Sequence, residues 1–224
     1  MSTWFIAGIG TDVGKTYVSA QIIRGLRAAG RRVQALKPVA SGVASPDAPD
    51  FTSSDTAVLL DALGLATTEQ TVAACTPWRF AAPLSPDMAA AAEGRRLPVA
   101  EMLAWCRRRI SEAGPETTTL VEGVGGIMSP FAEDALNLDV VVALGCPAVL
   151  VAGTYLGAIS HTLTALEVLR SRGAPTLAVV LNESPGEAVD LDATAVTLRR
   201  FAPGVAIVPL RRGGVLESLP FGVG

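Results

Sequence analysis

The sequence contains only two lysines, Lys15 and Lys37, beside 16 arginines. Lys15 ends a glycine-rich segment that follows a short apolar run, and Lys37 stands between a short apolar run and a segment of small residues that includes glycine. A lysine ammonium is a compact point charge on a flexible stem, which suits a position where a cation must approach a phosphate or a reacting centre. We therefore interpret both lysines as functional cations, although two lysines could also stand at such positions by chance.

Residues 8–16, GIGTDVGKT, link an apolar run to an amphipathic run and end in the Gly-Lys-Thr of a phosphate-binding loop. Glycine lets successive backbone N–H groups turn inward around an anion, and the N-terminus of the following helix adds positive dipole. In such a loop Lys15 reaches the β- and γ-phosphates and Thr16 ligates Mg²⁺. Five residues separate Gly8 from Gly14, one more than in the usual motif. The alternative is a glycine-rich turn that carries a surface lysine.

Polar residues near the other apolar runs supply the remaining candidates. Lys37 at a strand end would stabilise negative charge on a transferring phosphoryl group or its acceptor, unless it is simply solvated. Glu122 ends a later apolar run, before the glycine-rich residues 123–126, and its carboxylate would face the Mg²⁺. Asp55 is either a second metal ligand or a partner of a helix dipole. Ser41 would hydrogen-bond a polar substrate or be a plain loop serine.

The sequence does not support histidine or cysteine chemistry. His161 is the only histidine, so no Ser/His/Asp or Cys/His catalytic set can be assembled, and we interpret it as a packed or interface residue. Cys75, Cys106 and Cys146 lie far apart, which is neither a disulfide framework nor a zinc-ligand pattern. Reduced, buried thiols in a cytoplasmic protein are the simplest interpretation.

The candidate residues need a scaffold that brings strand ends together, and the pattern of apolar runs predicts one. Strands are expected over residues 3–8, 32–36, 117–121, 148–152, 176–181 and 205–208. Helices are expected over residues 16–29, 55–63, 83–93, 99–110, 158–170 and 191–201, and a loop over 43–52. Continuous apolar strands that alternate with helices indicate parallel strands covered on both faces. We therefore predict one three-layer α/β domain over residues 1–224, P-loop NTPase-like, with ligands at the carboxyl edge of a mostly parallel sheet.

Composition excludes several classes of protein. The chain has 18 basic and 21 acidic residues, a net charge of −3, so it lacks the basic excess of a nucleic-acid binder. Aromatic residues make up 5%, too few for base-stacking platforms. The most apolar run, residues 140–153, is too short to span a bilayer. The N-terminus lacks the positive region of a signal peptide, so we expect a cytoplasmic protein without membrane or nucleic-acid partners.

Six motifs occur in order along the chain. The loop at residues 8–16 is followed by KPVASG at 37–42, SD at 54–55, P-x-S-P at 83–86, VEGVGG at 121–126 and LG-x-x-SH at 156–161. Together they resemble the dethiobiotin synthetase family, over about residues 3–212. The combination is far more specific than a phosphate-binding loop alone.

The resemblance implies a reaction that uses ATP and Mg²⁺. The family carboxylates 7,8-diaminononanoate with CO₂ and closes a cyclic urea. One amine of the substrate forms a carbamate, whose oxygen attacks the γ-phosphate to give a carbamic-phosphoric anhydride. The second amine then closes the ring and expels phosphate. The carbamate is already anionic, so positioning and charge neutralisation suffice, and no acid–base histidine is needed.

The resemblance also implies roles by matched position. Lys15 and Lys37 would be catalytic, because they stabilise charge on the phosphoryl and carbamate oxygens. The Mg²⁺ ligands would be Thr16, Asp55 and Glu122. The nucleotide would contact Asp12, Val13, Gly14, Lys15, Thr16, Tyr17, Asp55, Glu122, Gly123, Val124, Gly125, Asn182, Pro209, Leu210 and Arg211. The diamine would contact Thr11, Lys37 and Ser41, and the helix start Gly157, Ala158, Ile159 and Ser160 of a neighbouring subunit. A homodimer with the active site at its interface is therefore part of the hypothesis.

The sequence departs from the family pattern at two positions, and two alternative functions compete with this interpretation. Asp87 occupies a position where the family usually has histidine, and Gly10 one where relatives often have aspartate. A partition- or septum-positioning ATPase of the same fold would need a signature lysine at position 10 and a basic or membrane-binding surface. A cobyrinate-amidating ligase would need a glutaminase domain, for which 224 residues leave no room.

Overall fold

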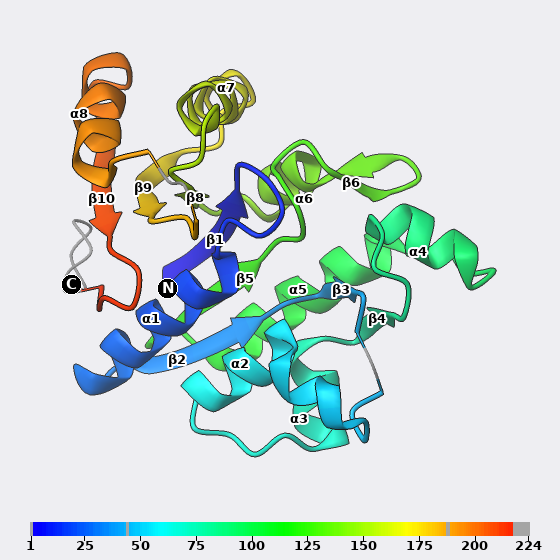
Figure 1. Cartoon of the computed structure of the whole chain (residues 1–224). Helices are drawn as coiled ribbons and strands as arrows, with labels where there is room; N and C mark the ends of the chain where they lie inside the picture. The colour runs from blue at the N-terminus through cyan, green and yellow to red at the C-terminus, as the bar shows by residue number, and fades with distance from the viewer. Residues whose placement is uncertain (1, 44, 187–188, 217–224) are drawn as a thin grey trace.

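The computed structural model describes residues 2–43, 45–186 and 189–216. Its centre is a six-stranded parallel sheet in the order β10-β9-β8-β1-β5-β2 (Figure 1). The strands of this sheet are β1 (Ser2–Gly8), β2 (Arg32–Leu36), β5 (Thr117–Glu122), β8 (Ala148–Ala152), β9 (Thr176–Asn182) and β10 (Ala206–Leu210). The predicted parallel sheet is confirmed, and each predicted strand matches an observed one to within two residues at either end.

The side chains of the strands alternate between two helical layers. On β1, Phe5 and Ala7 join one apolar cluster while Trp4 and Ile6 join the other, because successive strand residues point to opposite faces. The first cluster is covered by α5 (Val99–Ala113), α6 (Asn137–Leu144), α7 (Ala158–Ser171) and α8 (Leu191–Phe201). The second is covered by α1 (Lys15–Ala28), α2 (Asp55–Ala62) and α3 (Glu69–Cys75). Within the described ranges, no helix has the length and apolar character needed to cross a membrane.

Helix α1 follows the phosphate loop, and its sequence explains where it ends. Val18, Ile22 and Leu26 recur at helical spacing and are buried. Gly30 comes just after the helix with φ +73°, and the N–H of Arg31 donates to the carbonyl of Leu26 at 3.0 Å. This is the glycine-terminated helix end that the sequence predicts.

Short elements that the sequence patterns do not predict surround the sheet. They are β3 (Val39–Ser41) with β4 (Trp78–Phe80), the hairpin of β6 (Pro130–Ala132) and β7 (Ala135–Leu136), helices α3 and α6, and a 3-10 turn, Pro49–Ser53, at the end of the predicted loop. Strands of two or three residues are too short for an alternation to show. Helix α6 contains three consecutive valines, which favour strands, so tertiary packing decides its conformation.

Helix α4 (Pro86–Ala92) begins three residues later than the predicted 83–93. Proline fits the first turn of a helix, because it has no N–H that would need a partner there. Proline also keeps the residue before it out of the helical region, and Ser85 accordingly has ψ +147°. Residues 83–85 therefore stay outside the helix, and Pro83 lies against Gly42, where a Cβ would approach it to 3.1 Å.

The predicted site residues lie at the carboxyl ends of the parallel strands. Strand β1 leads into the phosphate loop, and β2 ends one residue before Lys37. Strands β5 and β9 end with Glu122 and Asn182 themselves. Parallel strands end along one edge of the sheet, so these residues are brought to the same edge.

Leu150 on the central strand β8 tests the assignment of the core. It is fully buried, so Leu150→Ala removes buried apolar atoms and leaves a cavity. We expect the free energy of unfolding to fall by about 2–5 kcal/mol, measured by chemical denaturation. The control is Leu65→Ala at a half-exposed position, which should change it by no more than about 0.5 kcal/mol. Equal losses of unfolding free energy in the two variants would contradict the assignment of Leu150 to the core.

Candidate active site

The phosphate loop turns through the left-handed backbone region. Gly14 precedes α1 with φ +90°, and Asp12 has φ +57°. Inside the turn, Lys15 Nζ donates to the carbonyl of Gly10 at 2.9 Å, and Lys15 is only 7% exposed. A Cβ on Gly8 would come within 3.0 Å of Lys15 Cδ, so glycine leaves room for the lysine. The ammonium lies folded within its own loop, where phosphate oxygens would take the place of the carbonyl.

The Glu122 carboxylate lies at the centre of the site. Its Oε1 accepts hydrogen bonds from the Thr16 hydroxyl and from Lys37 Nζ, each at 2.7 Å. Its Oε2 accepts from the Ser19 hydroxyl at 2.6 Å. Glu122 is 2% exposed, so these donors replace the water that a carboxylate otherwise needs. Sequence reasoning missed Ser19, although its place three residues after Thr16 puts both hydroxyls on the same side of α1.

Lys37 bridges two carboxylates that come from different elements. Its Nζ lies 2.7 Å from Glu122 Oε1 at the end of β5 and 2.8 Å from Asp55 Oδ2 at the start of α2. Burial by itself would lower the pKa of Lys37, but the charges of Glu122 and Asp55 outweigh it and raise that pKa. Burial also opposes ionisation of Asp55, yet the Lys37 charge and the hydrogen bond from Lys37 lower the pKa of that carboxyl. Lys37 and Asp55 are therefore both charged at neutral pH.

Lys15 has different electrostatic surroundings from Lys37. Burial lowers the pKa of Lys15 to about 8, and repulsion by the Lys37 charge adds to the effect. The carboxylates of Glu122, Asp55 and Asp12 offset only part of this lowering of the pKa. The two ammonium groups are therefore close enough to repel each other, and a bound polyanion would stabilise the charged forms of both.

The oxygen atoms around Thr16 suit a hard divalent cation. Mg²⁺ prefers oxygen ligands, and Thr16, Asp55 and Glu122 supply a hydroxyl and two carboxylates in one hydrogen-bonded group. The Asp55 side chain is 49% exposed, so this carboxylate can meet an ion that arrives with a nucleotide. Among residues 2–43, 45–186 and 189–216, no group of three or more His, Cys, Asp or Glu side chains could hold a metal ion. A Mg²⁺ ion at this position would also need ligands from outside the protein, such as phosphate oxygens and water.

Asn137 at the start of α6 holds the glycine-rich residues 123–126 in place. Its amide nitrogen donates to two carbonyls of this segment, and its Oδ1 accepts from the N–H of Val124 at 3.3 Å. Gly125 has φ +65°, and the predicted substrate contact Thr11 lies beside it, with Oγ1 3.7 Å from the place of a Cβ. Sequence reasoning missed Asn137, because its partners precede it by 11 and 13 residues and no local pattern links them.

Asn182 joins the end of β9 to the phosphate loop. Its Nδ2 donates to the carbonyl of Val13 at 3.1 Å, and its amide leaves no room for a Cβ on Gly14. Leu210, which ends β10, is in register with Asn182 and buried, while the neighbouring Pro209 is exposed. The structure therefore brings Asn182 to the loop and places Leu210 beside it on the next strand.

The segment after β10 returns to α1. Tyr17 Oη donates to the carbonyl of Gly214 at 2.8 Å. Arg211 instead forms an exposed ion pair with Asp192 on α8, at 2.6 Å. Of the predicted nucleotide contacts, Arg211 is thus engaged by another element in this structure.

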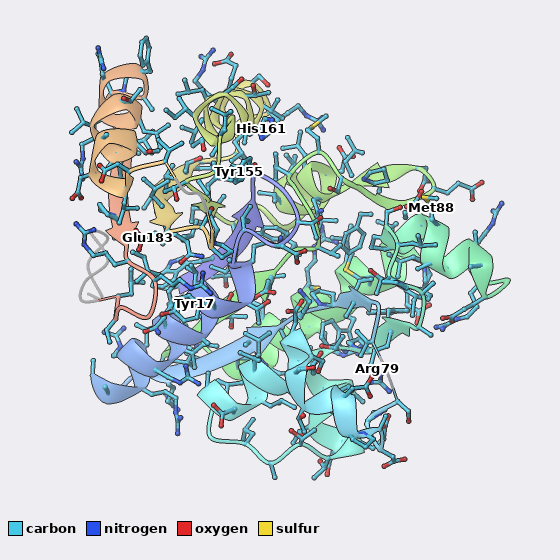
Figure 2. All side chains as sticks on the ribbon, viewed as in Figure 1. Tyr17, Arg79, Met88, Tyr155, His161 and Glu183 are labelled. Carbon is cyan, nitrogen blue, oxygen red and sulfur yellow. The ribbon has the colours of Figure 1, made fainter. Side chains whose placement is uncertain are left out.

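The predicted carboxylate-binding residues begin α7. Gly157 precedes this helix with φ +101°, Ala158 is buried and Ser160 is exposed. Tyr155 Oη and His161 Nδ1 lie 2.8 Å apart at the helix start (Figure 2), so the only histidine has a side-chain partner. Leu156 beside them is 90% exposed.

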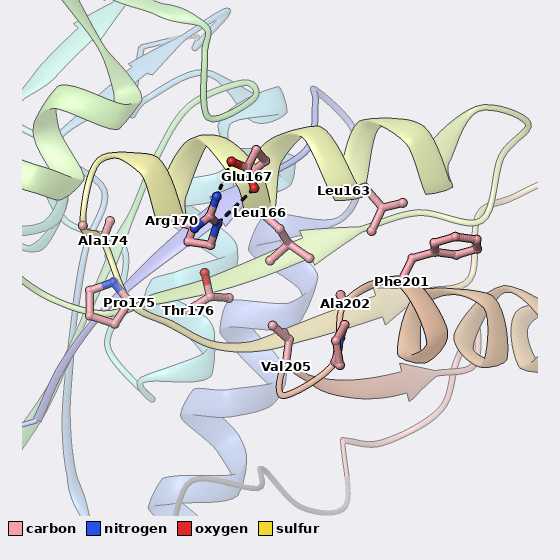
Figure 3. A pocket seen from close by; sticks show the side chains of 12 residues that line it. Leu163, Leu166, Glu167, Arg170, Ala174, Pro175, Thr176, Phe201, Ala202 and Val205 are labelled. Atoms are coloured by element: carbon pink, nitrogen blue, oxygen red, sulfur yellow. Dashed lines mark hydrogen bonds and ion pairs between the residues drawn. The ribbon is translucent and has the colours of Figure 1, made fainter.

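Two hollows of the surface lie away from the phosphate loop. One, of about 700 Å³, lies between α7 and α8 (Figure 3). Its lining includes Thr176 and Val205 at the amino ends of β9 and β10, so it lies at the edge of the sheet opposite to the phosphate loop. The other, of about 1220 Å³, is lined by α4 and the segments that follow it, including Asp87. Asp87 Oδ1 is buried without a hydrogen-bond partner among the described residues. None of the predicted site residues lines either hollow.

Solved structures with similar folds are P-loop proteins of other functions. The MinD cell division protein of Aquifex aeolicus has a TM-score of 0.51 and 17% identity, over 93% of this chain and 82% of that one. The signal recognition particle 54 kDa protein of Aeropyrum pernix, solved with GDP, has a TM-score of 0.51 and 16% identity, over 97% of this chain and 43% of that one. At such low identity these similarities show the P-loop NTPase fold alone.

Sequence relatives are far closer. A family model described as an AAA domain matches residues 2–214. The ATP-dependent dethiobiotin synthetase BioD of Methylobacterium nodulans is 53% identical over 96% of this chain and 95% of that protein. The proteins of the same name from Phenylobacterium zucineum and Caulobacter vibrioides are 48% and 46% identical, over 96% of this chain and 90% and 94% of their own lengths. The chain therefore belongs to the ATP-dependent dethiobiotin synthetase family.

Proposed function

We propose that the protein joins CO₂ to 7,8-diaminononanoate and closes the cyclic urea of dethiobiotin, with conversion of ATP to ADP and phosphate. The observation that carries the proposal is the position of Lys37 Nζ, 2.7 and 2.8 Å from two carboxylates, one of which also accepts from Thr16 of the phosphate loop. A cation fixed there would stand where a phosphoryl group meets its acceptor. The relatives at 46–53% identity support the same activity.

The proposed reaction has three steps. One amine of the diamine adds to CO₂ and loses a proton, which gives a carbamate. A carbamate oxygen attacks the γ-phosphorus of ATP, the bond from phosphorus to the bridging oxygen breaks, and ADP leaves. The second amine attacks the carbonyl carbon of the mixed anhydride, the bond to the phosphate oxygen breaks, and the ring closes with loss of a proton. Phosphoryl transfer concentrates charge on oxygen, which nearby ammonium groups neutralise.

The two lysines would divide this charge between them. Lys15 in the phosphate loop would contact the β- and γ-phosphates and neutralise their charge. Lys37 would face the carbamate and the transferred phosphoryl group, and its contacts with Glu122 and Asp55 fix it before the substrate arrives. A Mg²⁺ ion held by Thr16, Asp55 and Glu122 would neutralise phosphate charge when bound.

The remaining contacts are proposed from their positions around the loop. The nucleotide would be bound by Asp12, Val13, Gly14, Tyr17, Gly123, Val124, Gly125, Asn182, Pro209, Leu210 and Arg211. The diamine would contact Thr11 and Ser41.

We also propose a cytoplasmic homodimer in which the neighbouring subunit contributes the start of α7 to the site. The substrate carboxylate would bind at Gly157, Ala158, Ile159 and Ser160, because a helix N-terminus favours an anion. The exposed Leu156 beside this helix start is a large apolar side chain that a neighbouring subunit would remove from water. The three cysteines are free, which agrees with a reducing compartment.

Phosphate release in the presence of ATP, Mg²⁺ and bicarbonate tests the proposed reaction. We expect release to require 7,8-diaminononanoate, because the attacking oxygen exists only after the diamine has formed a carbamate. A colorimetric phosphate assay measures release, and mass spectrometry identifies dethiobiotin. Release that continues unchanged when the diamine is omitted would count against the proposed function.

Lys37→Gln tests the role of the bridging cation. We expect turnover to fall at least about 100-fold, as for other groups that stabilise a developing oxyanion. ATP affinity, measured by calorimetry, should change little, because the phosphate loop keeps Lys15. Arg24→Gln, which removes a cation from an exposed ion pair with Asp61, is the matched control and should retain full turnover. Unaltered turnover in Lys37→Gln would remove this residue from the mechanism.

The pKa of Lys15, about 8 in the free protein, predicts a pH dependence of ATP binding. Lys15 is charged below pH 8 and neutral above it, and bound phosphate raises its pKa, so binding above pH 8 takes up a proton. ATP affinity should therefore fall between pH 8 and 9.5, by up to about tenfold per pH unit. Lys37 remains charged over this range, because its pKa is raised.

Calorimetry in two buffers of different ionisation enthalpy measures both the affinity and the proton uptake. Arg24→Gln should follow the same curve as the unaltered protein. Constant affinity over this range, or binding without proton uptake, would contradict the assignment of Lys15.

A further inference from the structure

Ser19 is a residue of α1, the helix that follows the phosphate loop. It follows Thr16 by three residues and is completely buried. A serine within a helix commonly returns its hydroxyl to the carbonyl of the preceding turn. The Ser19 hydroxyl instead crosses to β5 and donates to Glu122 Oε2 at 2.6 Å. The bond therefore links two elements of the candidate site.

This hydrogen bond restricts the orientation of the Glu122 carboxylate. The terminal torsion of a glutamate has broad preferences, so it does not fix the carboxylate plane by itself. Oε1 accepts from Thr16 and Lys37, and Oε2 accepts from Ser19. With a donor on each oxygen, the plane is fixed and Oε1 stays directed at Thr16 and Lys37. Without the Ser19 hydroxyl, a buried oxygen would lose its partner and the carboxylate would turn to find another.

We propose that Ser19 is a positioning residue of the nucleotide site, which orients Glu122 and, through it, sets Thr16 and Lys37 for Mg²⁺ and the triphosphate. Ser19 lies outside the phosphate-loop motif and touches neither ion nor nucleotide in this role. The inference rests on the proposed function only in taking Glu122 as a partner of Mg²⁺. Removing the outer hydrogen-bond partner of a metal-binding group commonly costs about 10–100-fold in metal affinity.

Two substitutions separate the hydrogen bond from the packing at this position. Ser19→Ala removes the hydroxyl, whereas Ser19→Cys nearly keeps the volume but offers only a weak donor. Thr194→Ala is the matched control. Thr194 is also buried in a helix, and its hydroxyl donates at 2.7 Å to the carbonyl of Asp190, at the start of the same helix α8.

Calorimetric titration of ATP, once with Mg²⁺ and once with EDTA, provides the readout. We expect Ser19→Ala and Ser19→Cys each to reduce the Mg²⁺-dependent gain in ATP affinity by about tenfold or more. ATP affinity in EDTA should stay within about twofold of the unaltered protein, because Lys15 and the loop backbone are intact. Thr194→Ala should leave both affinities unchanged. A merely structural role for Ser19 would not separate the two affinities.

Three results would overturn the proposal: a full Mg²⁺-dependent gain in Ser19→Ala, its recovery in Ser19→Cys, or an equal loss in Thr194→Ala. If circular dichroism shows that Ser19→Ala does not fold, Ser19→Cys decides the question alone. The titration contains no diamine. A failure of the proposed reaction would be seen separately, as phosphate release by the unaltered protein that does not depend on the diamine.

Discussion

The burial of the Glu122 carboxylate is the constraint on which the rest of the site depends. Burying a carboxylate costs free energy unless hydrogen-bond donors and a nearby cation replace its hydration. Thr16 and Ser19 provide donors from α1, and Lys37 provides the cation from the end of β2. Asp55 then accepts from the same ammonium. Because these groups depend on one another, α1 cannot shift along the sheet without leaving a buried charge unpaired, and the phosphate loop is held in place.

The order of the strands makes this arrangement possible. Strand β5 lies between β1 and β2, so the phosphate loop, Glu122 and Lys37 leave three neighbouring strands at one edge. Asn182 comes from the other side of β1, at the end of β9, and reaches the carbonyl of Val13. The loop is therefore supported from both sides by strand ends, although the supporting residues are far apart in the sequence.

Features with a local physical signal could be predicted from the sequence, and those that depend on distant contacts could not. Apolar runs and the Gly-Lys-Thr motif predicted the sheet, its parallel strands and the loop, and strand ends predicted Lys37 and Glu122. Ser19 and Asn137 were missed, because a serine or asparagine in a helix is ordinary and their partners lie on other elements. The order of the strands in the sheet was likewise not predicted, because the alternation of strands and helices along the chain does not determine which strands pair.

The hydrogen bond of Tyr17 affects where the chain can be shortened or extended. It joins two residues 197 positions apart, one immediately after Thr16 and the other at Gly214 near the end of the described chain. A deletion that includes Gly214 would thus remove a hydrogen-bond partner of the first turn of α1. The opposite terminus enters β1 at exposed Ser2, on the far edge of the sheet from the loop. Tags and fusion partners belong at that amino-terminal end.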